Sequence, residues 1–231
     1  DYTVSYSNHV NPGTATVTIT GKGYYTGSRV INFTIKEKVI VKPDKPTLSS
    51  IGDKNTEIGS RVELTATVTN ADSAATYTYQ WYEAASKTAL GTKIANATSA
   101  KYSPATGKNG EKYYYCNVTV SKNGYTETTT TNRAKVRVTT PLSRATIGSI
   151  ATQTYTGKGI IPSVTVKYNG ITLTNGTDYA VSYSNYVNPG TATVTITGKG
   201  YYTGSRKINF TIKKPAVNLP AQATSSTVSI D

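Results

Sequence analysis

Residues 178–213 read DYAVSYSNYVNPGTATVTITGKGYYTGSRKINFTIK, and this stretch decides the fold class of the chain. In residues 191–197, alanine, valine and isoleucine alternate with four threonines. That is the period of a β-strand with one buried face and one solvated face. Apolar side chains alternate in the same way at 208–212, and the Asn-Pro-Gly at 188–190 is typical of a turn. The stretch therefore predicts short strands joined by tight turns.

The same stretch occurs twice in the chain, which indicates a duplicated module. Residues 1–36 repeat residues 178–213 with three differences: Thr3/Ala180, His9/Tyr186 and Val30/Lys207. Only the second copy follows residues 143–177, where another alternating row and Asn-Gly turns predict further strands. A complete module therefore spans 143–213, and residues 1–36 correspond to its second half.

This repeat sets the expected domain plan. The plan is half a β-repeat module at 1–41, a linker at 42–46, a different module at 47–139, a joint at 140–142, a complete β-repeat module at 143–213, and a tail or the start of a next module at 214–231. A half module leaves an apolar face and a sheet edge uncovered. We therefore expect residues 1–36 to pair with chain outside this sequence, with a neighbouring molecule or with the tail.

The middle module also reads as β-structure. Apolar residues alternate at 62–68 and 134–138, as in half-buried strands. The motifs YQWY at 79–82 and YYYCNV at 113–118 lie in similar rows. Together they make residues 47–139 resemble the immunoglobulin fold.

That resemblance implies a β-sandwich with a particular core. In the family, a buried tryptophan on strand C packs near a cysteine on strand F, which has a tyrosine two residues before it. Trp81, Cys116 and Tyr114 match these three positions. Ala66 stands where the family has its other cysteine, so the usual disulfide is absent. We expect these four residues to be structural core.

The repeat motifs point to a second family. They are YTGKGIIPSVTVKYNG at 155–170, GTDYAVSYSN at 176–185 and NPGTATVTITGKGYYTG at 188–204. They resemble a tandem module of large secreted and wall-attached proteins of Gram-positive gut bacteria (Firmicutes, Lachnospiraceae-like). The resemblance implies small all-β modules used in series, outside the cell, with no catalytic residues. We thus expect an all-β chain of small β modules around an immunoglobulin-like sandwich, with any signal or anchor outside this sequence.

The composition argues against catalysis. One histidine and one cysteine are too few for a two-histidine metal site or a cysteine zinc cluster. The histidine, His9, is replaced by Tyr186 in the other copy, which is typical of a surface position. The twelve acidic residues are scattered, which argues against a glycosidase pair. We expect no enzyme activity, no catalytic or metal-binding residue and no cofactor.

The net charge of +13 is spread along the modules. Nucleic-acid proteins cluster their basic residues, so we expect no nucleic-acid partner. We also expect no membrane insertion, because no apolar run approaches about 18 residues. Diffuse positive charge attracts acidic polymers, and exposed tyrosines beside cations can stack on sugars or dock proteins. The candidate ligand-binding residues are Tyr82, Tyr113, Tyr115, Tyr201, Tyr202, Lys199 and Arg206, of which Tyr113 and Tyr115 are expected to be exposed.

These features favour a non-enzymatic segment of a bacterial cell-surface protein. It would act as an adhesin or ligand-binding region for a host protein or glycan, such as mucin, immunoglobulin or another glycoprotein. Two alternatives stay open at this point. One is a spacer or carbohydrate-binding region of a secreted polysaccharide-degrading enzyme, and the other is a purely structural stalk.

Overall fold

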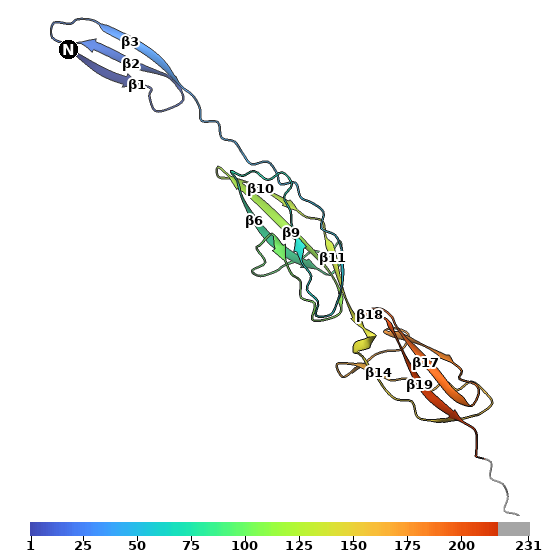
Figure 1. Cartoon of the computed structure of the whole chain (residues 1–231). Helices are drawn as coiled ribbons and strands as arrows, with labels where there is room; N and C mark the ends of the chain where they lie inside the picture. Colours follow the sequence, from blue (N-terminus) through green and yellow to red (C-terminus); the bar gives the residue numbers. More distant parts are fainter. Residues whose placement is uncertain (217–231) are drawn as a thin grey trace, which may run out of the picture. The chain divides into compact units, whose positions relative to one another are not determined.

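The computed structural model describes residues 1–216, whose regular structure is β-strand apart from one short 3-10 helix (Figure 1). This confirms the all-β prediction. The strands form a first sheet, a middle β-sandwich and the β-repeat module. No helix within residues 1–216 has the length and apolar character that a membrane span needs. The expectation that the tail at 214–231 covers the first sheet falls almost wholly outside the described residues.

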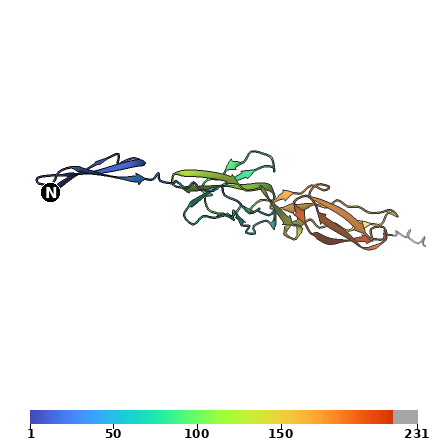
Figure 2. The ribbon, with the colours of Figure 1, turned by 90° about the horizontal axis from the view of Figure 1, so that it is seen from above.

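The first sheet consists of β1 (Tyr2–Ser7), β2 (Gly13–Gly21) and β3 (Ser28–Ile35), in that order and all antiparallel. Val17 of β2 lies opposite Tyr6 of β1 and Ile31 of β3. This register gathers the apolar side chains on one face and the threonines on the other, because side chains alternate along a strand. Figure 2 shows the sheet nearly edge-on as a single layer. We call its apolar side the open face.

The middle module is built around β9 and β11. Its strands are β4 (Lys54–Glu57), β5 (Leu64–Thr65), β6 (Thr76–Ala84), β7 (Thr92–Lys93), β8 (Lys101–Tyr102), β9 (Gly110–Lys122), β10 (Tyr125–Thr130) and β11 (Ala134–Pro141). β11 pairs with β9 antiparallel and with β4 parallel, and β6 lies on the other side of β9. β5 pairs with β8 in a separate small sheet. Leu64 in the small sheet and Trp81 in the large one are both 0% exposed, so the two sheets enclose one core.

Trp81 organises this core. Its indole N–H donates a hydrogen bond of 2.8 Å to the carbonyl of Ser99, and its ring stacks on Tyr102 with centroids 5.7 Å apart. Tyr102 in turn contacts Tyr114, whose ring centroid lies 5.8 Å away. Cys116 is fully buried with a free thiol. Trp81, Tyr114, Cys116 and Ala66 are all buried in this core, and the two facing sheets form the expected β-sandwich.

Burial also makes the Cys116 thiol a reporter of unfolding, because desolvation raises its pKa to about 11. Thiolate is the reactive form, so at pH 8 the native thiol is both inaccessible and protonated. We expect a maleimide to leave the native chain unmodified for hours and to label it fully in denaturing urea. Mass spectrometry measures both, with Cys116→Ser as the unlabelled control. Rapid labelling of the native chain would contradict the buried position.

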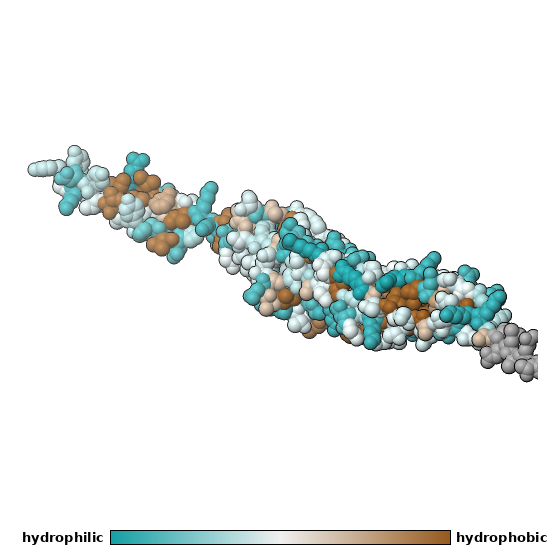
Figure 3. All heavy atoms as spheres, turned by 60° about the horizontal axis from the view of Figure 1, so that its bottom comes forward, coloured by the Kyte–Doolittle hydropathy of each residue, from teal (hydrophilic) through white to brown (hydrophobic). Residues whose placement is uncertain are grey.

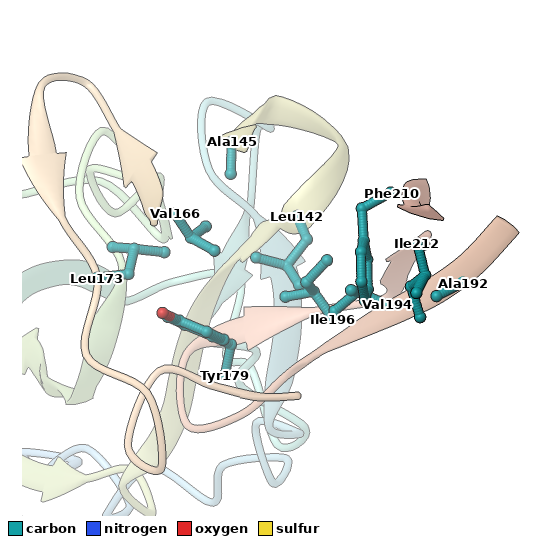
Figure 4. Packing of buried hydrophobic residues seen from close by; sticks show 10 residues of the cluster. All are labelled: Leu142, Ala145, Val166, Leu173, Tyr179, Ala192, Val194, Ile196, Phe210 and Ile212. Atoms are coloured by element: carbon teal, nitrogen blue, oxygen red, sulfur yellow. The ribbon is translucent and has the colours of Figure 1, made fainter. Parts of the chain in front are cut away.

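The β-repeat module follows η1 (Leu142–Arg144). Its strands are β12 (Thr146–Ile147), β13 (Gln153–Thr154), β14 (Val166–Tyr168), β15 (Ile171–Thr172), β16 (Tyr179–Ser184), β17 (Gly190–Gly198), β18 (Tyr202–Thr203) and β19 (Ser205–Lys213). β13, β19, β17 and β16 form one sheet, and β12, β14 and β15 form a second. Buried side chains from both sheets and η1 pack into one cluster (Figure 4). The expected joint at 140–142 is the end of β11 and the start of η1.

Candidate functional site

A row of tyrosines and cations follows the outer side of the middle sandwich, opposite the Trp81 core. We call it the outer strip. It consists of Tyr82, Glu111, Tyr113, Tyr115, Arg133, Lys135, Arg137 and Tyr201. The strip exists because β11 alternates: its valines and Ala134 face the core, so Lys135 and Arg137 face outward.

Tyr115 forms the most enclosed part of the outer strip. Its ring stacks on Tyr82 with centroids 5.0 Å apart and planes 4° from parallel. The guanidinium of Arg133 lies over the Tyr115 ring, 4.8 Å from its centroid, and donates hydrogen bonds to the carbonyls of Lys87 and Ala89. The Arg133 head is thereby fixed to the loop that follows β6.

The expectation that Tyr115 is exposed is wrong, because only 7% of the residue is accessible. The loop after β6 closes over it: a Cβ placed on Gly91 would lie 2.5 Å from the Tyr115 ring. Glycine is thus required where this loop meets the ring. Tyr113, two residues earlier, is half-buried.

Glu111 contacts three other side chains of the outer strip. The Tyr113 hydroxyl donates to its carboxylate at 3.2 Å, and Lys135 and Arg137 each approach the same carboxylate at 3.9 Å. Burial raises the pKa of Tyr113, and its bond to the Glu111 carboxylate adds to that shift. The phenol therefore stays protonated as a donor. A second carboxylate lies beside Glu111, because Asp53 accepts a hydrogen bond of 2.8 Å from the backbone N–H of Lys135. Lys135 and Arg137 are thus matched by two acids, and Arg133 gives the outer strip its positive excess.

Arg137 contacts Tyr201, the one member of the outer strip that belongs to the β-repeat module. Its guanidinium lies 5.2 Å from the Tyr201 ring centroid and donates a bond of 2.6 Å to the carbonyl of Gly200. The backbone N–H of Thr140 donates to the carbonyl of Tyr201 at 2.8 Å. These bonds fix the Tyr201 backbone, while 39% of the residue remains exposed. Tyr201 therefore presents a ring to solvent beside a cation.

The other candidate residues lie outside this strip. Tyr202 is half-buried against Tyr168, with ring centroids 6.4 Å apart. The Lys199 ammonium donates to the carbonyl of Gly176, and Arg206 donates to the carbonyl of Ala145 at 2.6 Å. The structure therefore brings Tyr82, Tyr113, Tyr115 and Tyr201 together, and places Tyr202, Lys199 and Arg206 in contacts within the β-repeat module.

The sequence reasoning missed the cations of the outer strip. The signal was present, because Arg133, Lys135 and Arg137 alternate with the apolar residues that it assigned to the core. Reading the opposite face of the same strand identifies them. Within residues 1–216, no three histidine, cysteine or acidic side chains gather as a metal site would require. The chemistry that the strip offers is charge attraction and stacking on flat rings.

No known protein family and no curated protein matches this chain. Several solved structures of tandem immunoglobulin-like domains resemble it. Sidekick-1 immunoglobulin domains 1–5 are 11% identical, with a TM-score of 0.42, and the match covers 90% of this chain and 48% of that one. An ICAM-5 D1–D4 ectodomain fragment is 9% identical, with a TM-score of 0.45, and the match covers 92% of this chain and 69% of that one. These scores are low, so the immunoglobulin-like assignment rests on the Trp81 core and the strand order.

Proposed function

We propose that this chain is a non-enzymatic, extracellular segment of a bacterial cell-surface protein, and that its outer strip binds acidic glycans of host glycoproteins. The observation that carries the proposal is the outward row of Arg133, Lys135 and Arg137 on one side of a rigid sandwich, with tyrosines beside it. Acidic sugars present a carboxylate or sulfate next to an apolar ring face. Arginine and lysine match the first group, and tyrosine matches the second.

The members of the outer strip differ in what they can offer a ligand. Arg133 is committed to the loop after β6, and Tyr115 is buried beneath it. The Lys135 side chain is 31% exposed, and its ammonium lies 3.9 Å from Glu111, a long ion pair from which it can turn toward an anion. Tyr201 supplies the exposed ring. Lys135 and Tyr201 are therefore the pair expected to contact the sugar.

A binding assay with the full chain tests this proposal. Immobilised polysialic acid and heparan sulfate serve as acidic glycans, and dextran serves as the neutral one. We expect saturable binding to an acidic glycan that persists at about 0.15 M salt, because partly buried charges are screened less than exposed ones. The double variant Lys135→Glu with Tyr201→Ala is expected to bind about tenfold more weakly or worse.

A charge-matched variant separates the outer strip from the overall charge. Lys207→Glu with Tyr24→Ala makes the same charge change and removes one exposed tyrosine that is not a member of the strip. It is expected to bind like the unaltered chain. Equal loss in both variants would assign binding to diffuse charge. Absence of binding at low and physiological salt would leave the stalk as the function.

A further inference from the structure

Three parallel strand pairings connect the segment by which the chain enters a module to the segment by which it leaves. In the middle module, the entering strand β4 pairs in parallel with the last strand, β11, so that Lys54–Glu57 lie opposite Val136–Thr139. In the β-repeat module, β13 pairs in parallel with the last strand, β19, so that Gln153–Thr154 lie opposite Ile212–Lys213. β18, which leads into β19, pairs in parallel with Thr140–Pro141 at the end of β11.

The direction of such a pairing decides how a module responds to a pull on its two ends. When the entering and leaving strands are parallel, the pull slides one strand along the other, and the hydrogen bonds between them carry the load together. When these strands are antiparallel, the pull separates them from one end, and the bonds break one after another. Forced unfolding is governed by the unfolding rate, so at equal thermodynamic stability the parallel arrangement resists a pull for longer.

Further hydrogen bonds lengthen the pairing of β4 with β11 at both ends. Before β4, the N–H of Ile51 donates to the side-chain carbonyl of Asn132 at 2.7 Å, and the side-chain amide of Asn132 donates to the carbonyl of Ile51 at 2.8 Å. After β4, the N–H of Ile58 donates to the carbonyl of Thr139 at 2.8 Å. We call residues 51–58 and 132–139 together the first clamp.

The β-repeat module has a corresponding set of bonds between its entering and leaving segments. Arg206 donates to the carbonyl of Ala145 at 2.6 Å, between the pairings of β18 and β13. The N–H of Tyr155 donates to the carbonyl of Lys213 at 2.8 Å and extends the pairing of β13 with β19. We call residues 140–155 and 201–213 together the second clamp.

β11 belongs to both clamps. The pairing with β4 ends at Thr139, and the pairing with β18 begins at Thr140, the next residue of the same strand. Two arginines add bonds in both directions at this point. Arg137 donates to a backbone carbonyl of the β-repeat module at 2.6 Å, and Arg144 donates to a backbone carbonyl of the middle module at 3.0 Å. No unbonded stretch of chain therefore separates the two clamps.

We propose that residues 51–213 bear tensile load, and that β11 passes the tension from the first clamp to the second. Residues 1–46 precede the first clamp and residues 214–231 follow the second, so a pull on the two ends of the chain reaches both clamps. This function goes beyond the binding of a glycan, because it requires no ligand at the outer strip.

The first sheet has no clamp of this kind. β2 separates β1 from β3, and both pairings of the sheet are antiparallel. Apolar residues of this sheet lie at its surface in Figure 3, so no second layer adds to its resistance. When the full chain is pulled, the first sheet is therefore expected to extend at lower force than either module.

Single-molecule force spectroscopy of the full chain tests the direction of loading, with Cys116→Ser removing the native thiol. One handle is attached at Lys214→Cys, and the other either at the N-terminus or at Thr156→Cys. The first geometry pulls β13 along β19. The second pulls the two strands apart from one end, because residues 156 and 214 follow the same end of a parallel pair. We expect the β-repeat module, identified by the length of chain that it releases, to unfold at a several-fold higher force in the first geometry.

Proline variants, pulled from the two chain ends, separate mechanical from thermodynamic stability. Thr56→Pro and Gln153→Pro each remove an N–H two residues before Ile58 and Tyr155, on the side of the strand that bonds its parallel partner. The matched control, Ser182→Pro, removes an N–H from the antiparallel pairing of β16 with β17. All three are expected to lower the urea midpoint, and only the first two to lower the unfolding force of their module.

Two results would overturn the proposal. One is an equal unfolding force of the β-repeat module in the two pulling directions. The other is a loss of force in Ser182→Pro as large as in Gln153→Pro, because resistance would then follow overall stability and not the parallel pairing. Neither result depends on glycan binding, so the load-bearing function and the binding function can fail separately.

Discussion

Replacing Trp81 with alanine is expected to lower the free energy of unfolding of the middle module by about 3–5 kcal/mol. The side chain is fully buried and stacks on Tyr102. Alanine leaves a cavity between the two sheets and leaves the carbonyl of Ser99 without its indole donor. No disulfide bridges the sheets, so most of this loss should appear directly as reduced stability.

Labelling of Cys116 in increasing urea measures this effect, because the thiol becomes reactive only when the same core opens. The urea midpoint of labelling should fall sharply in the Trp81→Ala chain. Leu90→Ala is the control, since Leu90 is 91% exposed, and it should change stability by less than about 0.5 kcal/mol. A Trp81→Ala midpoint close to that of the control would contradict the central role of the tryptophan.

Phe210→Ala and Phe33→Ala are expected to have very different effects, although the two residues occupy equivalent positions. The first removes a buried ring from the cluster of the complete module and should cost about 3–5 kcal/mol. The second removes a ring that is 42% exposed on the open face and that lies on a single sheet layer, so no enclosed cavity forms and the cost should stay below about 1 kcal/mol.

Hydrogen exchange measures the effect of each variant on each copy. Proteolytic peptides that contain one of the three positions at which residues 1–36 and 178–213 differ can be assigned to one copy. Phe210→Ala should speed exchange throughout β16, β17 and β19. Phe33→Ala should leave that region unaffected and change β1–β3 little. Since the local sequences are almost the same, equal effects would mean that residues 143–177 contribute little to the complete module.

Local patterns predicted the parts of this structure that depend on alternation. The buried row around Trp81, Tyr114 and Cys116 and the hairpin of β16 and β17 follow from side chains that alternate every second residue. The prediction for Tyr115 was wrong for a related reason. Alternation places Tyr115 on the outer face of its strand, and it contains no information on whether a loop closes over that face.

The outer strip depended on contacts between segments that are distant in the sequence. Tyr115 meets Arg133 through strand pairing, and Tyr201 meets Arg137 across 64 residues of sequence. No local period specifies such contacts, because they follow from strand order and register. The alternation of Arg133, Lys135 and Arg137 was visible in the sequence, and only their aromatic partners required the structure.

The single cysteine has a consequence for how the chain can be handled in a cell. Cys116 is enclosed in the core, and Ala66 takes the place of a bonding partner. A single cysteine cannot form an intramolecular disulfide, so folding of the sandwich requires neither a reducing nor an oxidising compartment. The unfolded chain can therefore reach its native fold without waiting for an oxidant or a disulfide isomerase.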